Sequence, residues 1–408
     1  MNFANKKVAI LGYGIEGEDA EKFFKSRGAD TTILDQKFDK NYLSNLDKYD
    51  LIVRSPGVYP LKNELSDLNV ITPTQIFLEE FKGTTIGVTG TKGKGTTSTL
   101  IYEILKANNA DVYLAGNIGK PLLSLLEKLN SKSTVVMEMS SFQLFDLKKS
   151  PNIAVVLNIT SDHMDWHKDI NEYINAKRSI VKYQSKSDWA VLNAEYKTSK
   201  EFEKNTNANV IYFSKKTLEE KFKKDLQLRG EHNLENIAAS VAVSKILNLD
   251  QKVVESVIKD FKGLEHRLEF VRSVNGIGFY NDSFATGPQP TIAAIKSFTE
   301  PMTIILGGSD KGLDYTELGN EIENIKNIKN IILIGTTAIK IKKVLNKDSK
   351  FNIYDLGFAT MKEIVSKAFE VTSKGGVVIL SPASASFDMF ENYKDRGSQF
   401  KKTVLQLK

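Results

Sequence analysis

Backbone amides spaced by glycine are the first chemistry that the sequence offers, in Gly90-Thr91-Lys92-Gly93-Lys94-Gly95-Thr96-Thr97. The segment lies between a strand-like run and a helical stretch, so its amides and the helix N-terminus would present donors to phosphate oxygens. Lys94 would reach the β- and γ-phosphates. Gly95 stands where a full phosphate-loop motif has a hydroxyl, which makes Thr96 the nearest candidate ligand for Mg²⁺. The loop favours ATP or a similar triphosphate, and the alternative is a turn without a ligand.

A second glycine-rich segment, Gly12-Tyr13-Gly14-Ile15-Glu16-Gly17, follows the first strand-like run and precedes a helix. Asp35 closes the next strand-like run, so the spacing matches the dinucleotide fingerprint, including its acidic residue. Three interpretations remain open at this point. The loop binds a nicotinamide dinucleotide, it binds another nucleotide, or it makes a tight turn without a ligand.

Three of the four histidines lie in polar settings at the ends of predicted elements. A single histidine is more often structural than a ligand, but this clustering favours function. Glu138, at the end of the predicted strand 134–139, adds an oxygen ligand suited to Mg²⁺. His167 alone lacks such a setting. The three others are His163 in Ser161-Asp162-His163-Met164-Asp165, His232 in Glu231-His232-Asn233-Leu234-Glu235-Asn236, and His266 beside Arg267.

Short apolar runs alternate with amphipathic stretches along the whole chain, which predicts an α/β fold with parallel sheets buried on both faces. Helices are predicted at 94–107, 169–183 and 233–261, and a strand pair follows the last of these. New strand–loop–helix units begin near Lys82-Gly83 and Lys262-Gly263. The predicted strands are 7–11, 31–34, 51–53, 85–88, 134–137, 153–157, 302–306, 330–334 and 375–380.

The composition of the 408 residues excludes several classes of protein. There is no cysteine, so disulfides, thiolate metal sites and cysteine nucleophiles are absent, as in many cytosolic proteins. The 56 basic and 50 acidic residues are spread along the chain, and no basic cluster interleaved with aromatic residues predicts nucleic-acid binding. No apolar run approaches 18 residues, and we do not expect the first residues to be a secretory signal. We therefore expect a cytoplasmic protein that binds neither nucleic acid nor membrane.

Taken in order, these motifs resemble those of the Mur ligases, ATP-dependent enzymes that form amide bonds in peptidoglycan synthesis. Within that family the chain is most similar to the members that add glutamate. The motifs that carry the resemblance are 90–97, Gly116-Asn117-Ile118-Gly119, Glu138-Met139-Ser140-Ser141-Phe142-Gln143-Leu144, 162–165, His232-Asn233 with Asn236, His266-Arg267, Asn281-Asp282-Ser283 with Ala285-Thr286, Gly307-Gly308 with Asp310-Lys311-Gly312, and 381–388.

The resemblance implies three domains: a Rossmann-like domain for the UDP substrate at 1–82, a phosphate-loop ATPase domain at 83–263, and a Rossmann-like domain for the amino acid at 264–408. The first glycine loop then binds a nucleotide diphosphate and not a nicotinamide. The implied reaction joins D-glutamate to UDP-N-acetylmuramoyl-L-alanine through an acyl phosphate. We expect a monomer that uses ATP and two Mg²⁺ ions.

The resemblance also assigns roles to individual residues. Lys94, His163 and Lys177 would be catalytic, and Lys177 aligns with a lysine that the family carbamylates. ATP would be bound by Gly90, Thr91, Lys92, Gly93, Lys94, Gly95 and Thr96, with Asn233, Asn236, Arg267 and Asp282. One Mg²⁺ would be bound by Glu138 and Thr96, and the other by His163 and Lys177. The UDP substrate would contact Gly14, Ile15, Asp35, Lys37, Asn117, Ser140 and Gln143. Glutamate would contact Thr286, Lys311, Ser386, Phe387 and Tyr393.

The sequence departs from the family pattern at Gly95, at Phe284 and Gly287, where glutamate-adding members usually have lysine and asparagine, and at Lys37, often an arginine. An L-glutamate acceptor and a catalytically silent nucleotide-binding regulator therefore stay open as alternatives. A further alternative is folylpolyglutamate synthase, which shares the ATPase and the last domain. The first 80 residues, with their own glycine loop, argue against it.

Overall fold

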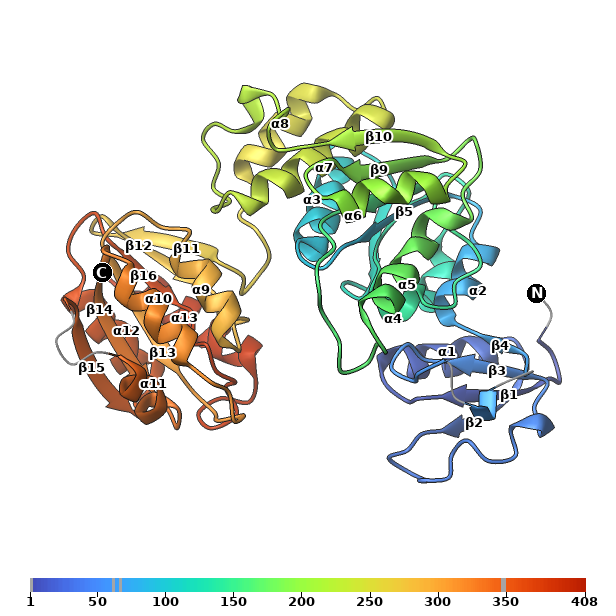
Figure 1. The fold of residues 1–408 in the computed structure, drawn as a ribbon, viewed down its shortest axis with the longest axis horizontal. Coiled ribbons are helices and arrows are strands. Elements are labelled where there is room, and N and C mark those ends of the chain that lie inside the picture. Colours follow the sequence, from blue (N-terminus) through green and yellow to red (C-terminus); the bar gives the residue numbers. More distant parts are fainter. Residues whose placement is uncertain (1–2, 61–62, 66–67, 346–349) are drawn as a thin grey trace. The chain divides into compact units, whose positions relative to one another are not determined.

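The computed structural model describes residues 3–60, 63–65, 68–345 and 350–408. Within these residues the chain forms three sheets with flanking helices and divides into two compact units (Figure 1). One unit comprises residues 1–224 and 232–258, and the other comprises residues 225–231 and 259–408. The expected α/β fold with three domains is confirmed, whereas the domain boundaries at 82/83 and 263/264 stay predictions.

The first sheet has four parallel strands in the order β2-β1-β3-β4. The glycine loop lies between β1 and α1, as expected from its sequence. The elements are β1 (Lys7–Leu11), α1 (Ile15–Ser26), β2 (Asp30–Leu34), β3 (Leu51–Arg54), β4 (Val70–Ile71) and α2 (Pro73–Glu80), with short 3-10 helices η1 (Leu46–Lys48) and η2 (Asn63–Leu65).

The second sheet has six parallel strands in the order β10-β9-β8-β5-β7-β6. From β5 the chain first builds one side of the sheet and then the other, so the carboxyl end of β5 adjoins the point where an α/β sheet binds ligands. The strands are β5 (Thr84–Thr89), β6 (Val112–Gly116), β7 (Thr134–Glu138), β8 (Ile153–Val156), β9 (Trp189–Asn193) and β10 (Asn209–Phe213). The helices are α3 (Lys94–Ala107), η3 (Leu123–Lys128), α4 (Ser141–Leu144), α5 (Ile170–Lys182), α6 (Lys197–Lys200), η4 (Glu201–Asn205), η5 (Glu220–Phe222), α7 (His232–Ile246) and α8 (Gln251–Asp260).

The third sheet has the order β11-β12-β16-β13-β14-β15, in which β11 is antiparallel to β12 and the other pairs are parallel. Its elements are β11 (Glu269–Val274), β12 (Ile277–Asn281), α9 (Pro288–Ile295), β13 (Met302–Gly307), α10 (Thr316–Asn324), β14 (Ile328–Ile334), α11 (Ala338–Val344), β15 (Asn352–Gly357), α12 (Met361–Val371), β16 (Val377–Leu380) and α13 (Tyr393–Gln406).

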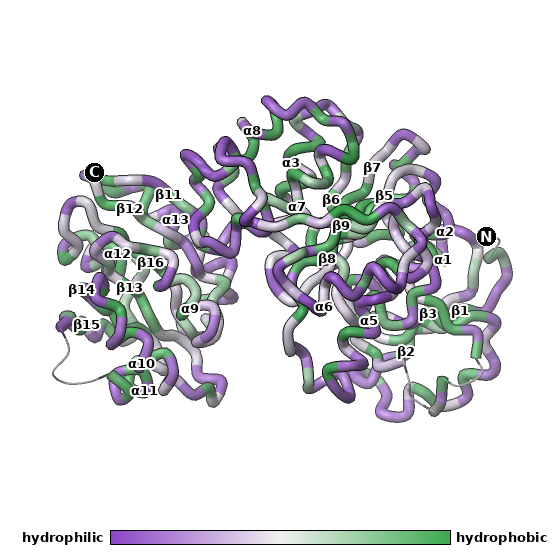
Figure 2. Tube along the Cα trace, turned by 45° about the horizontal axis from the view of Figure 1, so that its top comes forward, coloured by the Kyte–Doolittle hydropathy of each residue, from purple (hydrophilic) through white to green (hydrophobic). Residues whose placement is uncertain are grey.

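Apolar residues line both faces of this third sheet, which explains its unbroken hydrophobic strands. Ile304 and Ile331 belong to the cluster on one face, together with residues of α9, α10 and α11. Their neighbours Ile305 and Ile332 belong to the cluster on the other face, with residues of α12 and α13. Figure 2 shows hydrophobic residues along the strands and hydrophilic residues along the outer turns of the helices and many connecting loops. In a strand that is buried on both faces no side chain faces solvent, so apolar and polar residues do not alternate along its sequence.

Buried charges join the first and second sheets inside the first unit. Arg54, at the end of β3, is fully buried, and its guanidinium pairs with Asp146 at 2.7 Å and donates to the Val58 carbonyl at 2.5 Å. On α1, the Asp19 carboxylate accepts the backbone N–H groups of Leu123 and Ser124 at 2.9 and 3.2 Å. These contacts hold the α1 side of the first sheet against the second sheet.

The predicted strands are all present, and the helix at 94–107 begins and ends as expected. The stretch 233–261 is two helices, because Asn248 adopts a left-handed conformation with φ 52° and ends the first of them. The strands that the sequence did not indicate are β4, β6, β9, β10 and β15, and all of these except β9 are edge strands. None of the helices in the described part of the chain has the length and apolar character that a membrane crossing requires.

Replacement of Arg54 by alanine should destabilise the first unit by about 3–5 kcal/mol, because it leaves Asp146 and buried carbonyls without their partner. Urea unfolding followed by tryptophan fluorescence measures this, since Trp166 and Trp189 both lie in that unit. Arg27→Ala is the matched control, because the Arg27–Glu80 pair at 2.6 Å is partly exposed and should contribute about 1 kcal/mol or less. Equal losses in the two variants would contradict this account of Arg54.

Candidate active site

The phosphate loop connects β5 to α3 and is shaped by a glycine that no other residue can replace easily. Gly93 precedes the helix with φ 86°, and a Cβ atom there would lie 2.3 Å from the Asn236 side-chain oxygen. The Lys94 Nζ donates to the carbonyl oxygens of Gly90 and Thr91, both at 2.9 Å. The amides at the start of α3 and the Lys94 charge therefore lie together, as the sequence predicts.

Helix α7 supports the phosphate loop from one side. Asn236 accepts a hydrogen bond from the Thr97 hydroxyl at 3.2 Å, and its amide donates to the Asn233 side chain at 2.8 Å. All three residues are buried. Because Thr97 is occupied in this way, the half-buried Thr96 is the better candidate for a Mg²⁺ ligand in place of the hydroxyl that Gly95 lacks.

Glu138 and Asn117 meet at the carboxyl ends of the neighbouring strands β7 and β6. The Asn117 side-chain amide donates to a Glu138 carboxylate oxygen at 2.7 Å, and its backbone N–H donates to the Glu138 carbonyl at 3.0 Å. Glu138 is only 5% exposed. A buried carboxylate that points from a strand end beside a phosphate loop fits a Mg²⁺ ligand.

Lys177, on α5, is the most unusual charged residue of the site. Its side chain is 1% exposed, so the alternative that it is a solvated surface lysine is wrong. The Nζ donates to the Gly90 carbonyl at 3.0 Å and the Thr89 hydroxyl at 3.3 Å. Burial, reinforced by the positive charge of Lys94, holds the pKa of Lys177 well below its ordinary value, although the carboxylates of Asp162 and Glu138 oppose this shift.

His163 follows β8 in a left-handed conformation with φ 54°, and its side chain is 47% exposed. Its ring contacts Phe142 at 4.9 Å between ring centres, and Asp162 lies 3.6 Å from its Nε2. In the described ranges, no three His, Asp or Glu side chains form a ready-made metal site.

Sequence reasoning missed Tyr173 and His167, which hold this site in place. The Tyr173 hydroxyl lies 3.0 Å from the Thr91 hydroxyl, and its ring lies under the Lys177 Nζ at 4.7 Å. Tyr173 and Lys177 are four residues apart on one helix, and this spacing was the signal that could have identified Tyr173.

His167 is buried with its Nε2 2.9 Å from the Ser141 hydroxyl and its Nδ1 3.4 Å from Glu172. Burial lowers the pKa of His167, and no motif pointed to this residue.

The first glycine loop is closed by Asp35, whose carboxylate accepts the backbone N–H groups of Tyr13 at 2.6 Å and Lys37 at 2.8 Å. These bonds lower the pKa of Asp35. Gly14 and Ile15 are exposed at the tip of the loop. Asp35 therefore organises the loop that the sequence assigned to the UDP substrate.

Gln143 links that glycine loop to the second sheet. Its amide donates to the Glu16 carboxyl at 2.7 Å, and its oxygen accepts from the backbone N–H of Ser140 at 3.0 Å. The Ser140 hydroxyl in turn caps α4 by accepting from the Gln143 backbone N–H. One short chain of hydrogen bonds thus joins Glu16 of the first glycine loop to the predicted substrate residues Gln143 and Ser140.

The second unit brings the predicted amino-acid residues together in two groups. The Lys311 ammonium lies 5.5 Å from the Phe387 ring centre, and the Phe387 side chain is exposed. The Tyr393 ring packs edge-on against Phe284 at 5.0 Å. Ser386 is buried beside Phe387, and its backbone carbonyl accepts the N–H groups of Met389 and Phe390. The Thr286 backbone N–H donates to the Phe284 carbonyl at 2.8 Å.

Asp282 and Arg267 lie in the same unit, next to that second group. The Asp282 carboxyl accepts from the Ser381 hydroxyl at 2.6 Å and from the Leu268 backbone N–H at 3.1 Å. Burial outweighs these bonds and raises the pKa of Asp282 to about 7. The Arg267 guanidinium lies over the Phe284 ring.

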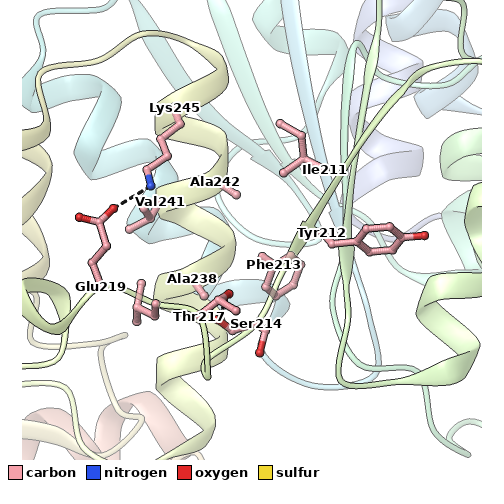
Figure 3. Close-up of a pocket in the computed structure, with 11 residues that line it drawn as sticks. Ile211, Tyr212, Phe213, Ser214, Thr217, Glu219, Ala238, Val241, Ala242 and Lys245 are labelled. Carbon is pink, nitrogen blue, oxygen red and sulfur yellow. Dashed lines mark hydrogen bonds and ion pairs between the residues drawn. The ribbon is translucent and has the colours of Figure 1, made fainter.

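A small hollow lies away from the phosphate loop, between the edge strand β10 and helix α7 (Figure 3). Its volume is about 210 Å³, and the ion pair of Glu219 and Lys245 at 2.8 Å borders it. None of the predicted site residues lines this hollow. A wider and more open depression includes Lys37, which is predicted to contact the UDP substrate, among its lining residues.

Comparison with known proteins identifies the family. Residues 88–244 match the model of the Mur ligase middle domain, and residues 266–384 match the model described as Mur ligase, glutamate ligase domain. The chain is similar in fold to the MurF ligase from Thermotoga maritima in complex with ADP, with a TM-score of 0.60 and 17% identity over 99% of this chain and 96% of that chain. The chain belongs to the Mur ligase family, and is thus an ATP-dependent ligase that forms amide bonds.

Relatives within the family narrow the assignment further. The chain is 38% identical to the UDP-N-acetylmuramoylalanine--D-glutamate ligase of Acetivibrio thermocellus, over 98% of this chain and 96% of the relative. It is 37% identical to the enzyme of the same name from Oenococcus oeni, over 99% of this chain and 98% of the relative. Mur ligases use ATP and Mg²⁺, and the residues around the phosphate loop fit both.

The raised pKa of Asp282 predicts a specific dependence of stability on pH. In the folded chain this carboxyl binds its proton more tightly than in the unfolded chain, so its stabilising contribution is complete below about pH 4 and is lost as the pH rises through 7. The free energy of unfolding of the wild type, relative to Asp282→Asn, should therefore fall by up to about 1.4 kcal/mol per pH unit across that window.

Calorimetric unfolding at several pH values measures this difference. Asp314→Asn is the control, because Asp314 is exposed and its hydrogen bonds to Thr316 hold its pKa below the ordinary value. The difference in the free energy of unfolding between Asp314→Asn and the wild type should stay constant between pH 5 and 7. A constant difference for Asp282→Asn as well would show that Asp282 is ionised throughout this range.

Proposed function

We propose that the chain joins D-glutamate to UDP-N-acetylmuramoyl-L-alanine at the expense of ATP, as a step in the synthesis of peptidoglycan precursors. The proposal also takes the protein to be a cytoplasmic monomer. The observation that carries it is the contact of the buried Lys177 amine with the Gly90 carbonyl of the phosphate loop. The relatives that match over nearly their full length are named UDP-N-acetylmuramoylalanine--D-glutamate ligase, and that name supports the substrates proposed here.

The reaction proposed has two steps. The carboxylate of the UDP-linked substrate takes the γ-phosphoryl group of ATP, and ADP leaves. The amine of glutamate then attacks the acyl phosphate and displaces phosphate, which leaves the new amide. Exclusion of water is required between the steps, because water would hydrolyse the acyl phosphate.

The phosphate loop and its neighbours serve the first step. Lys94 and the amides at the start of α3 offset the charge of the transferring phosphoryl group. ATP supplies that group, and Mg²⁺ supplies the positive charge that neutralises its oxygens. Glu138 and Thr96 would bind one Mg²⁺, and His163 and Lys177 a second. Asn233, Asn236, Arg267 and Asp282 are the further residues proposed to bind the nucleotide.

Lys177 suits the second metal position only as a carbamate. An ammonium has no lone pair for Mg²⁺ and would repel it, whereas a carbamate offers anionic oxygens. Carbamate formation joins the neutral amine to CO₂ with loss of one proton, so it requires the lowered pKa that burial gives this lysine. The Tyr173 ring, 4.7 Å from Nζ, favours the cation, whereas burial favours the neutral amine.

The two substrates are assigned to different residues. Gly14, Ile15, Asp35 and Lys37 of the first glycine loop and β2 end would bind UDP, and Asn117, Ser140 and Gln143 the muramoyl part. For the acceptor, Lys311 would pair with a carboxylate, and Thr286, Ser386, Phe387 and Tyr393 would complete the site. Phe284 and Gly287 differ from the usual pattern, so the stereochemistry of glutamate is the part of the proposal that most needs a direct test.

The wild type should release phosphate only when Mg²⁺, ATP, UDP-N-acetylmuramoyl-L-alanine and glutamate are all present, with a higher kcat/KM for D- than for L-glutamate. Lys94→Ala should lower turnover at least about 10³-fold, because it removes charge stabilisation from the phosphoryl group. Lys106→Ala, an exposed lysine at the end of α3, is the matched control and should retain activity.

Preference for L-glutamate would overturn the proposed acceptor and leave the ligase chemistry in place. Tight nucleotide binding without phosphate release under all of these conditions would favour the catalytically silent regulator instead. Wild-type turnover in Lys94→Ala would remove the phosphate loop from the mechanism.

Lys177→Arg should lower turnover at least about 100-fold although it retains a positive charge, because a guanidinium cannot form the carbamate. Lys177→Ala should be equally impaired, and added formate should restore part of its activity by supplying an oxygen ligand. Lys182→Arg, an exposed lysine on the same helix, is the control. Full activity of Lys177→Arg would exclude the carbamate.

A further inference from the structure

Phe284 exposes a large aromatic side chain among residues proposed to bind the nucleotide and the acceptor. It is 38% exposed, although the flanking Ser283 and Ala285 are buried. The Arg267 guanidinium carbon lies 3.9 Å from the centre of its ring, well inside the range of a cation–π contact. Tyr393 packs edge-on against the same ring with centres 5.0 Å apart and planes at 90°. Core packing does not account for a phenylalanine at this position.

Two hydrogen bonds, one on each side of Arg267, join the loop of Arg267 to the loop of Phe284. The Phe284 N–H donates to the His266 carbonyl at 3.0 Å, and the Leu268 N–H donates to the Asp282 carboxylate at 3.1 Å. His266 and Leu268 both adopt left-handed conformations, with φ 64° and 45°, so the chain turns sharply before and after the arginine. The stacked arrangement is therefore built into the geometry of the loop.

Helix α13 closes the group from the other direction. Tyr393 begins this helix, and its ring contacts the His266 ring with centres 6.1 Å apart. One turn later, a Cβ atom on Gly397 would lie 2.3 Å from the His266 Nδ1, so only glycine permits this close approach. Arg267, Phe284, Tyr393 and His266 thus form a continuous set of contacts.

Stacking suits an arginine that must bind phosphate. The centre of the Phe284 ring lies 3.9 Å from the Arg267 guanidinium carbon, and the ring restricts the movement of the guanidinium, which presents its N–H donors in its own plane for bidentate contact with phosphate. A stacked guanidinium also has fewer rotamers to lose when it binds an anion, which improves affinity without a new contact. Phe284 carries no charge and no hydrogen-bond donor, so it cannot bind the phosphates itself.

We propose that Phe284 is a positioning residue that holds the Arg267 guanidinium ready to bind the phosphates of the nucleotide. The proposal rests on the proposed function, because it takes Arg267 as a nucleotide ligand. Phe284 acts through Arg267 and touches no reacting atom.

The full-length protein allows a direct test with ADP as the probe. Phe284→Leu keeps an apolar side chain and removes the aromatic face, and it should weaken ADP binding in calorimetric titration by about three- to tenfold. The KM for ATP should rise by the same factor, with kcat and the unfolding temperature unchanged. Phe284→Trp keeps an aromatic face and should bind ADP like the wild type. Phe358→Leu, at a 70% exposed phenylalanine of the same unit, is the matched control and should also bind normally.

Combination with Arg267→Lys tests whether Phe284 acts through Arg267. Lysine keeps the charge and loses the planar group, so the double variant should bind ADP no more weakly than Arg267→Lys alone. Wild-type ADP binding by Phe284→Leu, equal losses in the Leu and Trp variants, or multiplied losses in the double variant would each overturn the positioning role. A simultaneous fall in kcat and unfolding temperature would show a merely structural role. Failure of the wild type to bind ADP would instead overturn the proposed function itself.

Discussion

The burial of one lysine against the phosphate loop is the constraint on which the rest of the first unit depends. The Lys177 amine lies between α5 and the loop that follows β5, where it donates to the Gly90 carbonyl and the Thr89 hydroxyl. A neutral amine has two N–H donors, and these two acceptors match them. Burial of the charged form would be costly in a place that already holds the Lys94 ammonium. The site therefore favours a lysine that is neutral or chemically modified.

The surrounding elements are arranged to keep this lysine where it is. Tyr173 lies one turn before it on α5 and reaches the Thr91 hydroxyl, so the helix and the loop are joined at two points. His167 joins the start of the same region to Ser141 of α4. Glu172 of α5 accepts a hydrogen bond from Tyr59 at 2.8 Å, which connects the helix to the first sheet. These hydrogen bonds thus connect α5 and the residues just before it to the phosphate loop, to α4 and to the segment that follows β3.

In the second unit a buried arginine has the comparable organising role. Arg396 of α13 is fully buried and donates to the Ser283 hydroxyl at 2.9 Å and to the carbonyl oxygens of Ser283, Ser384 and Ala385 at 2.9 to 3.2 Å. It joins the loop of Asp282 and Phe284 to the segment that contains Ser386. The buried guanidinium replaces ordinary core packing with hydrogen bonds that fix the loops in one arrangement.

Much of this could be predicted from the sequence, because glycine spacing, strand-like runs and single acidic or basic residues at strand ends are local signals. Lys94, Glu138 and the glycine loops lie where such signals predict. Contacts between distant segments carry no local signal, and His167 was therefore judged to lack a functional setting although it is buried beside Ser141. Among the edge strands that were missed, β4 has only two residues and Asp355 interrupts the apolar run of β15. In contrast, β6 and β10 contain the continuous apolar runs Val-Tyr-Leu-Ala and Val-Ile-Tyr-Phe, which were a usable signal. The stacking of Arg267 on Phe284 similarly depends on two loops that are close only in the folded chain.

The state of the Lys177 amine can be observed directly. Carbon-13 NMR of the protein in ¹³C-labelled bicarbonate detects a carbamate carbon without any turnover. We expect one protein-bound carbamate resonance in the wild type and in Lys182→Arg, and no such resonance in Lys177→Arg. An active wild-type enzyme without that resonance, or a resonance that persists in Lys177→Arg, would contradict it.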